Sequence, residues 1–411
     1  MRNGTVAASL SGESAPRSCS RMDRGRTTRL KRLAAVTLAS LAAAGFFVGG
    51  CSSEPKPSTS PDGFLYATNF ASDSITGYSV NSVTGALSQL PQFPLPTGPG
   101  SEPSSVVAAP SGNFLYTWTN DGCRAYRVNR QSGVLTEISG SPFQTLGAPV
   151  VTDPAGKFLL TMRADRPNDV SVYAIDPGTG AITAAGPPVT VGRFPHIPAF
   201  TPDSSFLYVS SPGRIQIFSF DGTTGQMAET AASPFFPAES PGALAVIGDF
   251  LLVAAFPDAI AAYSINSSTG ELTLASGSPV SISRLPVGPM TVHPSGKFLY
   301  VVDLPHCCSD DDFRDSGFSV LSVNPATGAL EVVPGSPFKV GTEPSFLSGV
   351  GVAGSIDPAG NFLYATNHGN GVLGYRIEAT TGSLTPLAGS PFPAGLLTLR
   401  TAILSQQEVS Q

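Results

Sequence analysis

The sequence predicts an all-β fold, a seven-bladed β-propeller with four strands in each blade. The first observation is a Phe-Leu-Tyr-like triplet that follows a tight turn seven times, at spacings of 44 to 64 residues. The second is a Thr-Gly type of turn later in each repeat, and such a period with strand-like content is typical of propeller blades. The third is a composition of 44 Gly and 38 Pro with 13% charged residues, which suits short strands and tight turns better than helices. The triplets begin at Phe64, Phe114, Phe158, Phe206, Phe250, Phe298 and Phe362, and the later turns contain Gly85, Gly133, Gly180, Gly225, Gly270, Gly328 and Gly382.

The sixth repeat shows how one blade is encoded. Residues 289–292 form a short apolar segment before a His-Pro-Ser-Gly turn, and this segment is the predicted innermost strand. Residues 298–303 are a continuous apolar run, which is typical of a strand buried on both faces. Residues 318–323 follow as the third strand, and 330–333 follow the Thr-Gly turn as the outer strand. A glycine in that turn supplies the positive φ that it needs.

A Ser-Pro-Phe motif ends most repeats and predicts the exit to the next blade. Proline is tolerated there because an outermost strand has an unpaired edge and does not need every N–H donor. We expect the phenylalanines of this motif to fill the gaps between neighbouring blades. They are Phe143, Phe235, Phe338 and Phe392.

The two ends of the repeat region predict how the ring closes. The first repeat begins at residue 61, already past the place of an innermost strand, while residues 399–405 look like an innermost strand without a blade of its own. We therefore expect the C-terminal strand to complete the N-terminal blade, which would remove both open edges.

Strand order also divides the connections between two faces of the ring. The turns from first to second and from third to fourth strand are short, and we name their side the tight-turn face. The loops from second to third strand and the crossovers between blades lie on the other side, the loop-rich face. Loops of varying length on a rigid frame are where binding residues are expected, so the loop-rich face is the predicted functional face.

The charge balance excludes one class of partner. The chain has 23 Lys and Arg against 29 Asp and Glu, and residues 51–411 hold 15 of the basic and 27 of the acidic residues. Such an acidic domain offers no broad basic surface for a phosphate backbone, so nucleic acid is not an expected partner. We expect a monomer without a cofactor.

The N-terminal residues indicate export. Basic residues precede an apolar stretch at 33–48, which is shorter than a bilayer span and typical of a secretory signal. The sequence Val48-Gly49-Gly50-Cys51 resembles a bacterial lipobox, which implies lipidation of Cys51 and cleavage before it. The predicted parts are a signal peptide at 1–50, with Met22 as a more typical start, a flexible tether at 51–60, the propeller at 61–405 and a tail at 406–411. The expected location is the bacterial envelope, as an outer-membrane lipoprotein; the alternative is an ordinary signal with an incidental cysteine.

Two residues near the predicted channel mouth are candidates for chemistry. His196 precedes the innermost strand of the fourth blade, where it could act as a general base or bind a sugar-like ligand. Arg193 lies three residues before it. The alternative is a structural histidine in the crossover. Further candidate ligand-binding residues follow the second strands on the same face, where they either line an entrance or simply end strands; they are Asn69, Asn120, Asp303, Asn367 and His368.

The second-to-third loop of the sixth blade invites a metal hypothesis. It contains His306, Asp310 and Asp312, which are donors suited to zinc or calcium. The spacing matches no EF-hand, so we expect a solvated acidic loop and no metal. The adjacent Cys307 and Cys308 allow a vicinal disulfide, and free thiols are the alternative.

The repeat Pro-x-Gly-x-Phe-Leu-Tyr…Thr-Gly-x-Leu…Gly-Ser-Pro-Phe, over residues 61–405, resembles the seven-bladed lactonase family. This family is related to 6-phosphogluconolactonase and to YVTN-type surface repeats. The resemblance implies a Pro-His before a middle innermost strand, which Pro195-His196 matches. It also implies an Arg-His pair where this chain has Gly288-Pro289, and an Asn-Glu where it has Asp303-Leu304. An anion-binding arginine and a carboxylate are therefore missing from their family positions.

Three functions follow as hypotheses. The first is an anchored propeller lipoprotein that binds a small molecule, glycan or protein on the loop-rich face. The second is a lactone hydrolase, a carboxylic ester hydrolase in which His196 activates water and Arg193 polarises the carbonyl. The third is a structural envelope protein. No Gly-x-Ser-x-Gly elbow, His-Glu-x-x-His helix or Gly-rich phosphate loop in the sequence supports another chemistry.

Overall fold

The structure, a computed structural model, describes residues 63–163, 168–282, 284–304, 317–339, 354–367 and 371–405. Within these ranges the chain is built of β-strands and one short 3₁₀ helix, η1 (Phe70–Ser72). No helix in this part of the chain has the length and apolar character needed to cross a membrane. The predicted signal peptide, Cys51, the tether and the tail lie outside the described residues, so they stay predictions.

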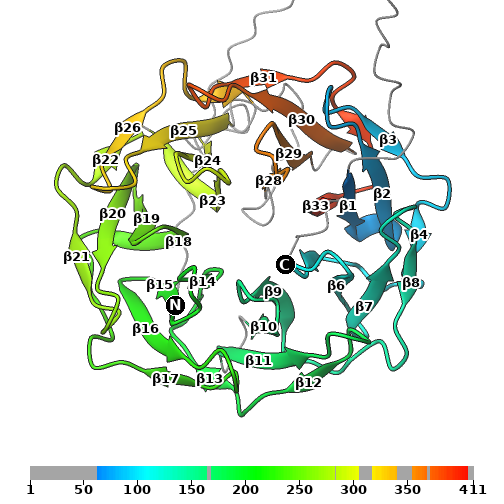
Figure 1. The fold of residues 1–411 in the computed structure, drawn as a ribbon, viewed down its shortest axis with the longest axis horizontal. Helices are drawn as coiled ribbons and strands as arrows, with labels where there is room; N and C mark the ends of the chain where they lie inside the picture. Colours follow the sequence, from blue (N-terminus) through cyan, green and yellow to red (C-terminus); the bar gives the residue numbers. More distant parts are fainter. Residues whose placement is uncertain are drawn as a thin grey trace, which may run out of the picture. The chain divides into compact units, whose positions relative to one another are not determined.

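Seven antiparallel sheets form a ring (Figure 1), which confirms the predicted seven-bladed propeller. From the inside outwards, the first three blades contain β33 (Thr398–Ser405), β1 (Gly63–Asn69), β2 (Ser74–Val80) and β3 (Leu87–Gln89); β5 (Ser105–Ala108), β6 (Phe114–Thr119), β7 (Gly122–Val128) and β8 (Leu135–Glu137); and β9 (Ala148–Thr152), β10 (Phe158–Arg163), β11 (Asp169–Ile175) and β12 (Ile182–Ala184). The fourth and fifth contain β14 (Ala199–Phe200), β15 (Phe206–Ser211), β16 (Arg214–Phe220) and β17 (Met227–Glu229); and β18 (Ser240–Ile247), β19 (Phe250–Phe256), β20 (Ala259–Ile265) and β21 (Leu272–Leu274). The last two contain β23 (Leu285–Val292), β24 (Phe298–Leu304), β25 (Gly317–Val323) and β26 (Leu330–Val332); and β28 (Gly354–Ile356), β29 (Phe362–Asn367), β30 (Gly371–Ile377) and β31 (Leu384–Pro386).

The C-terminal strand closes the ring as predicted. β33 pairs antiparallel with β1, in a register that runs from Gly63 opposite Ser405 to Asn69 opposite Thr398. The sheet of the first blade therefore takes three strands from the start of the chain and its innermost strand from the end (Figure 1). This pairing covers the edge of β1 that would otherwise expose its backbone groups.

The outer strand of each blade has a second piece, which the sequence did not reveal. After the turn that follows the outer strand, which is a Ser-Pro turn in five of the blades, the chain does not leave at once but pairs again with the third strand of its own blade. In five blades this piece is a two-residue strand: β4 (Leu95–Pro96), β13 (Val189–Thr190), β22 (Val280–Ser281), β27 (Phe338–Lys339) and β32 (Phe392–Pro393). In the other two it is a single bridge, Cys123 to Phe143 and Ile215 to Phe235.

The serine of the Ser-Pro turn explains how the interrupted ladder stays satisfied. Its hydroxyl oxygen accepts a hydrogen bond from the third-strand N–H that lies at the interruption. This occurs in five blades, where the donors are Ala125, Ile217, Ala262, Val320 and Gly374 and the distances are 2.7–3.1 Å. A buried N–H without a partner would cost free energy, so the serine is part of the fold.

The turn glycine and the triplet phenylalanine, which define the repeat, contact each other across neighbouring blades. At every Thr-Gly-type turn, an added Cβ would lie 2.4–2.7 Å from the ring of the triplet phenylalanine in the preceding blade. Each of these glycines has a φ between +69° and +78°. The contact also crosses the ring closure, because Gly85 of the first blade meets Phe362 of the seventh. The phenylalanine ring fills the space beside the turn and leaves no room for a side chain there, so both residues recur in every repeat.

The tyrosine of the triplet forms a second link between blades. Its hydroxyl donates to the carbonyl oxygen of the turn glycine in the next blade, at 2.7–3.0 Å in five places. One of these bonds, from Tyr364 to Gly85, again joins the last blade to the first. Leu160 and Leu252 take the tyrosine position in the third and fifth blades.

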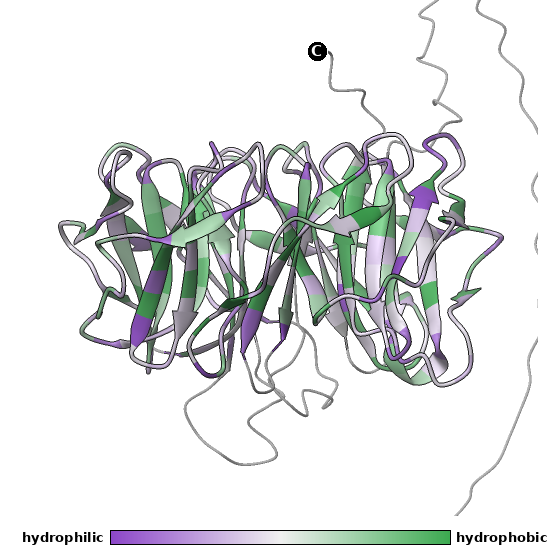
Figure 2. Ribbon diagram, turned by 90° about the horizontal axis from the view of Figure 1, so that it is seen from below, coloured by the Kyte–Doolittle hydropathy of each residue, from purple (hydrophilic) through white to green (hydrophobic). Residues whose placement is uncertain are grey.

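The core is a ring of blade–blade interfaces. Seven hydrophobic clusters are described, and each one combines side chains of two neighbouring blades. Phe143, Phe235 and Phe338 pack against such clusters and Phe392 is a member of one, as the sequence predicts. The side view shows apolar strands running between the two faces (Figure 2). Their rigid stacking fixes where the loops of each face begin.

Candidate functional site

The loop-rich ends of the second strands form a ring of equivalent positions. Each lies five residues after the triplet phenylalanine and pairs with the first residues of the third strand. Ala255 is the apolar member of this ring. The other six residues are polar: Asn69, Thr119, Arg163, Ser211, Asp303 and Asn367. A polar ring of this kind at one end of apolar strands is consistent with a functional face, and three of its members were candidates from the sequence.

Asn69 has all its hydrogen-bonding groups in use. It is fully buried, and its amide donates to the hydroxyls of Ser74 at 3.1 Å and Thr76 at 2.8 Å. Its side-chain oxygen accepts from the N–H of Gly395 at 3.0 Å and the hydroxyl of Thr398 at 3.2 Å. Asn69 thus ties the first blade to the chain that enters the closing strand, and it offers nothing to a ligand in this arrangement.

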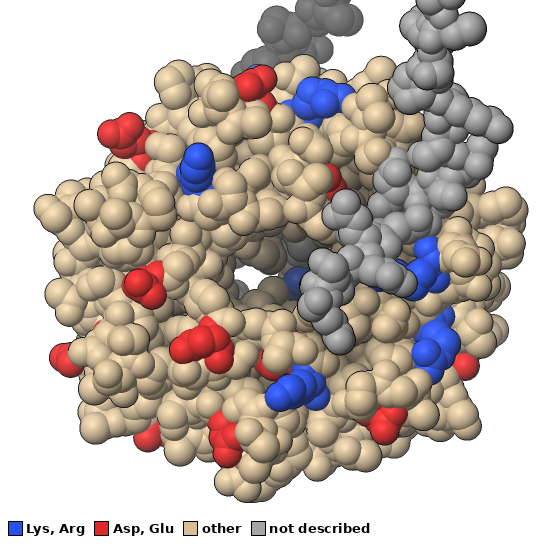
Figure 3. Space-filling model, viewed as in Figure 1, with Lys and Arg blue, Asp and Glu red and all other residues tan. Residues whose placement is uncertain are grey.

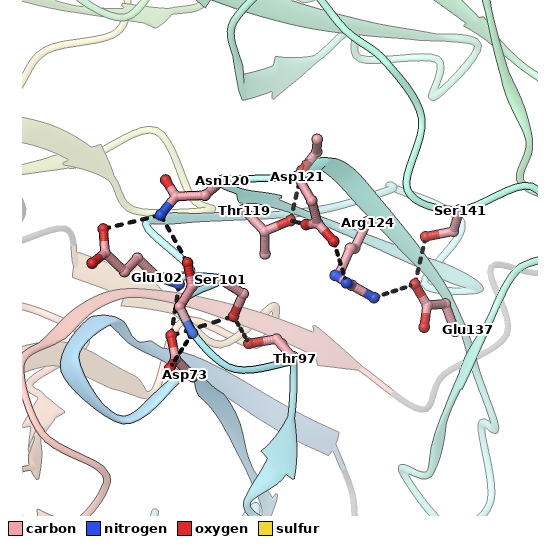
Figure 4. Close-up of polar contacts among 12 residues, drawn as sticks. Asp73, Thr97, Ser101, Glu102, Thr119, Asn120, Asp121, Arg124, Glu137 and Ser141 are labelled. Atoms are coloured by element: carbon pink, nitrogen blue, oxygen red, sulfur yellow. Dashed lines mark hydrogen bonds and ion pairs between the residues drawn. The ribbon is translucent and has the colours of Figure 1, made fainter.

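Asn120 lies one residue beyond the end of β6, on the surface, and it belongs to a polar cluster at the junction of the first two blades (Figure 4). Its amide donates to the carbonyl of Gly100 at 2.9 Å and to the carboxylate of Glu102 at 3.1 Å. Asp73 holds the same crossover by accepting from the N–H groups of Gly100 and Glu102, each at 2.8 Å. These backbone hydrogen bonds lower the pKa of the Asp73 carboxyl. The cluster orders the crossover.

The other half of this cluster is an ion-pair network. The guanidinium of Arg124 contacts Asp121 at 2.5 Å and Glu137 at 2.8 Å, and Glu137 also accepts from the hydroxyl of Ser141 at 2.8 Å (Figure 4). Every charged group of the network has an ionic partner within it, so we assign the network a structural role.

Asp303 makes a buried ion pair in the sixth blade. Its side chain is fully buried and its Oδ1 contacts the Nε of Arg284, which precedes β23. The second oxygen, Oδ2, is buried and has no hydrogen-bond partner. A buried carboxylate oxygen without a donor is unusual, because most buried polar atoms are satisfied. Asp303 therefore keeps an acceptor for which the described protein supplies no donor.

Arg284 was not anticipated from the sequence. The family resemblance points to Gly288 and Pro289, four and five residues further along, where the pairing of β23 with β24 loses its register between Pro286 and Met290. Before this irregularity Pro286 lies opposite Asp303, and Arg284, two residues earlier, reaches the carboxylate with its side chain. An arginine in the short crossover between β22 and β23 was the available signal. The chain thus has a guanidinium beside Asp303 although its family position lacks one.

His196 lies at the entry to β14 and is partly buried. Its backbone N–H donates to the carbonyl of Ser210 at 3.0 Å, which fixes the crossover against β15. No hydrogen bond joins its ring to another described residue. Burial lowers the pKa of the imidazole from its ordinary value of 6.5, so the ring is neutral at pH 7. A neutral ring with free nitrogens can accept or donate one hydrogen bond to a ligand.

The side chain of Arg193 makes a different contact from the one that a role in polarising a ligand beside His196 would require. It is exposed, and its guanidinium stacks on the ring of Phe194, with its carbon 5.0 Å from the ring centroid. Phe194 is itself 62% exposed and has a φ of +53°. No described contact brings Arg193 to His196. Arg193 and Phe194 form an exposed basic and aromatic pair just before His196 in the chain.

Several sequence candidates lie outside the described residues or lack a described side chain. His306, Cys307, Cys308, Asp310 and Asp312 fall in the first group, as does His368. Asn367 ends β29, and Leu304 ends β24, without a described side chain. Among the residues that the structure does describe, no group of His, Cys, Asp and Glu could hold a metal ion, and Cys123 is a buried free thiol.

The opposite, tight-turn face contains a pocket of about 310 Å³ between the fourth and fifth blades. It exists because the turn Gly248-Asp249 of the fifth blade is only two residues long, whereas other blades carry longer turns that cover their neighbour; Gly156, for example, packs on Pro110. The carboxylate of Asp203 in its wall already accepts from Thr201 and Ser205. None of the sequence candidates lines this pocket.

A comparison with solved structures finds the same fold in lactonase-like proteins. One is a putative 6-phosphogluconolactonase from Bacteroides fragilis, 17% identical, with a TM-score of 0.66 over 86% of this chain and 100% of that one. Another is a periplasmic gluconolactonase from Pseudomonas aeruginosa, also 17% identical, with a TM-score of 0.62 over 84% of this chain and 99% of that one. At these identities the likeness concerns the fold alone. No curated protein matches the chain.

The sequence pattern of one protein family matches the chain directly. The family is described as "Lactonase, 7-bladed beta-propeller", and it matches residues 56–150 and 140–246, which run from before β1 into β18. The seven sheets complete the architecture that this description names. Over residues 56–246 the sequence is therefore similar to the lactonase family of seven-bladed β-propellers.

Proposed function

We propose that this protein is an envelope-anchored propeller lipoprotein that binds a small molecule at the loop-rich mouth of its central channel. The observation that carries the proposal is the state of the polar groups there. The ring of His196 has no described partner, and Oδ2 of Asp303 is buried without a donor. Buried polar groups normally find partners, so groups left open at one end of a rigid channel favour a ligand site. A space-filling view shows that the ring has a central opening (Figure 3).

The test is a binding comparison at His196. We expect sugar lactones and sugar acids, screened by isothermal titration calorimetry, to include a ligand whose affinity falls about tenfold in His196→Ala, because one hydrogen bond contributes about 1–1.5 kcal/mol. Lys297→Met, on the exposed tight-turn face, is the control and should bind as wild type does. Equal affinity of wild type and His196→Ala for every ligand found would contradict the proposed place of the site.

Lactone hydrolysis is the second candidate function, and the lowered pKa of His196 favours it. As a base, the neutral imidazole would take a proton from water while the water oxygen bonds to the lactone carbonyl carbon. The ring C–O bond would then break, and the proton would pass to the departing oxygen to give a hydroxy acid. The Pseudomonas relative is named a periplasmic gluconolactonase, which supports such chemistry in an exported member of this fold.

The same variant separates binding from catalysis. If hydrolysis occurs, the rate should fall roughly 100-fold or more in His196→Ala. In wild type it should decline as the pH falls through a value below 6.5, because protonation removes the base. Lactone binding without His196-dependent hydrolysis would leave binding as the function.

The anchor is tested separately. Cells grown with a labelled fatty acid should transfer label to the wild-type protein and not to Cys51→Ser, because Cys51 is the cysteine that the lipobox-like sequence presents for diacylation. Label that persists in the Cys51→Ser protein would refute the lipoprotein proposal while leaving the propeller site untouched.

A further inference from the structure

The closing strand brings one basic side chain to the innermost layer of the first blade. Arg400 lies on β33 directly opposite Thr68 of β1, close to the loop-rich end of the strand pair. Residues directly opposite each other on antiparallel strands extend to the same side of the sheet. Arg400 and Thr68 therefore share one side of this blade.

That side faces the second blade. Tyr66 and Ala402 belong to the same row, and they pack in the cluster that contains Val106 and Leu115 of the second blade. The alternate row faces the seventh blade, since the hydroxyl of Thr401 lies 2.9 Å from that of Ser355. Arg400 and Thr68 thus continue an apolar row at its loop-rich end, beside the innermost strand β5.

Neither polar group has a partner among the described residues. Thr68 is fully buried and its hydroxyl has no hydrogen bond. Arg400 is partly buried, and no hydrogen bond or ion pair joins its guanidinium to another described residue. Burial lowers the pKa of that guanidinium, as expected where water is removed and no carboxylate replaces it.

Three other partly buried arginines differ from Arg400. Arg124, Arg163 and Arg284 are at most 29% exposed, and each pairs with a carboxylate. A cation removed from water without a counter-ion costs free energy, and a bound anion would offset that cost. Arg400 lacks the carboxylate partner that these three arginines have.

We propose that Arg400 and Thr68 form an anion subsite in the channel wall, which binds the carboxylate of a small organic acid. The planar guanidinium can donate two parallel hydrogen bonds to a carboxylate, and the threonine hydroxyl can donate a third. One arginine balances the single charge of a carboxylate better than the double charge of a phosphate. This inference rests on the proposed function and names its ligand class, but the subsite belongs to the first blade and His196 to the crossover into the fourth.

The test uses the full propeller and acetate as the minimal probe. Sodium acetate, compared with sodium chloride at equal ionic strength, should raise the melting temperature of wild type by a few degrees, since a ligand stabilises the state that binds it. Arg400→Met should abolish the acetate-specific rise, and Thr68→Val should reduce it. Lys297→Met removes the same charge from the opposite face and should keep the full rise. Without acetate, Arg400→Met should melt no lower than wild type, because no described contact is lost.

Three outcomes would overturn the subsite: no acetate-specific rise in wild type, an equal rise in Arg400→Met, or a larger Arg400-dependent rise with inorganic phosphate. Failure here is distinct from failure of the proposed function. If His196-dependent binding of lactones or sugar acids persists without the acetate effect, only the subsite is wrong. If the acetate effect depends on Arg400 while no compound binds through His196, the subsite stands and the proposed site at His196 fails.

Discussion

A chain that ends at Leu397 is expected to give no folded monomer. The missing β33 supplies the innermost strand of the first blade and is paired along the whole of β1. It also contributes Ala402 and Leu404 to the interface with the second blade. We expect a loss comparable to the whole free energy of folding of a domain, about 5–15 kcal/mol, because one blade edge and one interface open together.

Circular dichroism and size-exclusion chromatography measure this outcome. The truncated protein should show aggregation or no cooperative thermal transition. A chain that ends at Ser405, which keeps β33 complete and lacks only the predicted tail, is the control and should behave as the full chain does. A soluble monomer with a wild-type transition after removal of β33 would show that the ring does not depend on its closing strand.

Gly85→Ala is expected to destabilise the protein by about 3 kcal/mol. An added methyl group would lie 2.4 Å from the ring of Phe362, and the backbone there has a φ of +74°. Overpacking a tight core costs about 1–3 kcal/mol, and a non-glycine residue with positive φ adds about 1 kcal/mol. Gly85 and Phe362 also join the first and last blades, so the substitution weakens the contact at which the ring closes.

Gly277→Ala separates these two effects. Gly277 has a φ of +79°, but nothing lies within 4 Å of its added Cβ. Urea denaturation should therefore show a loss of about 1 kcal/mol for Gly277→Ala and clearly more for Gly85→Ala. Equal losses would mean that the Phe–Gly contact contributes nothing beyond backbone strain.

The fold could be predicted from the sequence because the residues that recur in every repeat are the ones that contact each other between blades. The triplet phenylalanine and the turn glycine recur together since one packs on the other in the next blade. The closing strand was predictable for a similar reason, as the first repeat lacks an innermost strand and the chain ends with one. The second piece of each outer strand was missed, because it depends on a serine hydroxyl that replaces a backbone acceptor.

The candidate site was less accessible to sequence reasoning. Asn69 has the residue type of a ligand-binding position, yet its four hydrogen bonds all serve the fold. The pairing of Arg284 with Asp303 joins a crossover residue to the end of the neighbouring strand, a contact that no motif encodes. Arg400 stands alone in an otherwise ordinary strand, and only the absence of a described partner distinguishes it. Such features are set by tertiary pairing, so a linear pattern does not show them.

The central claim is that a small molecule binds at the loop-rich mouth of the channel, and a ligand-bound crystal structure tests it most directly. The compound from the lactone and sugar-acid panel with the highest affinity would be soaked into crystals of the propeller. We expect its density on the loop-rich face, in contact with His196 or with the open oxygen of Asp303. Density in the tight-turn pocket lined by Thr201 and Asp249, with the channel mouth empty, would contradict the account.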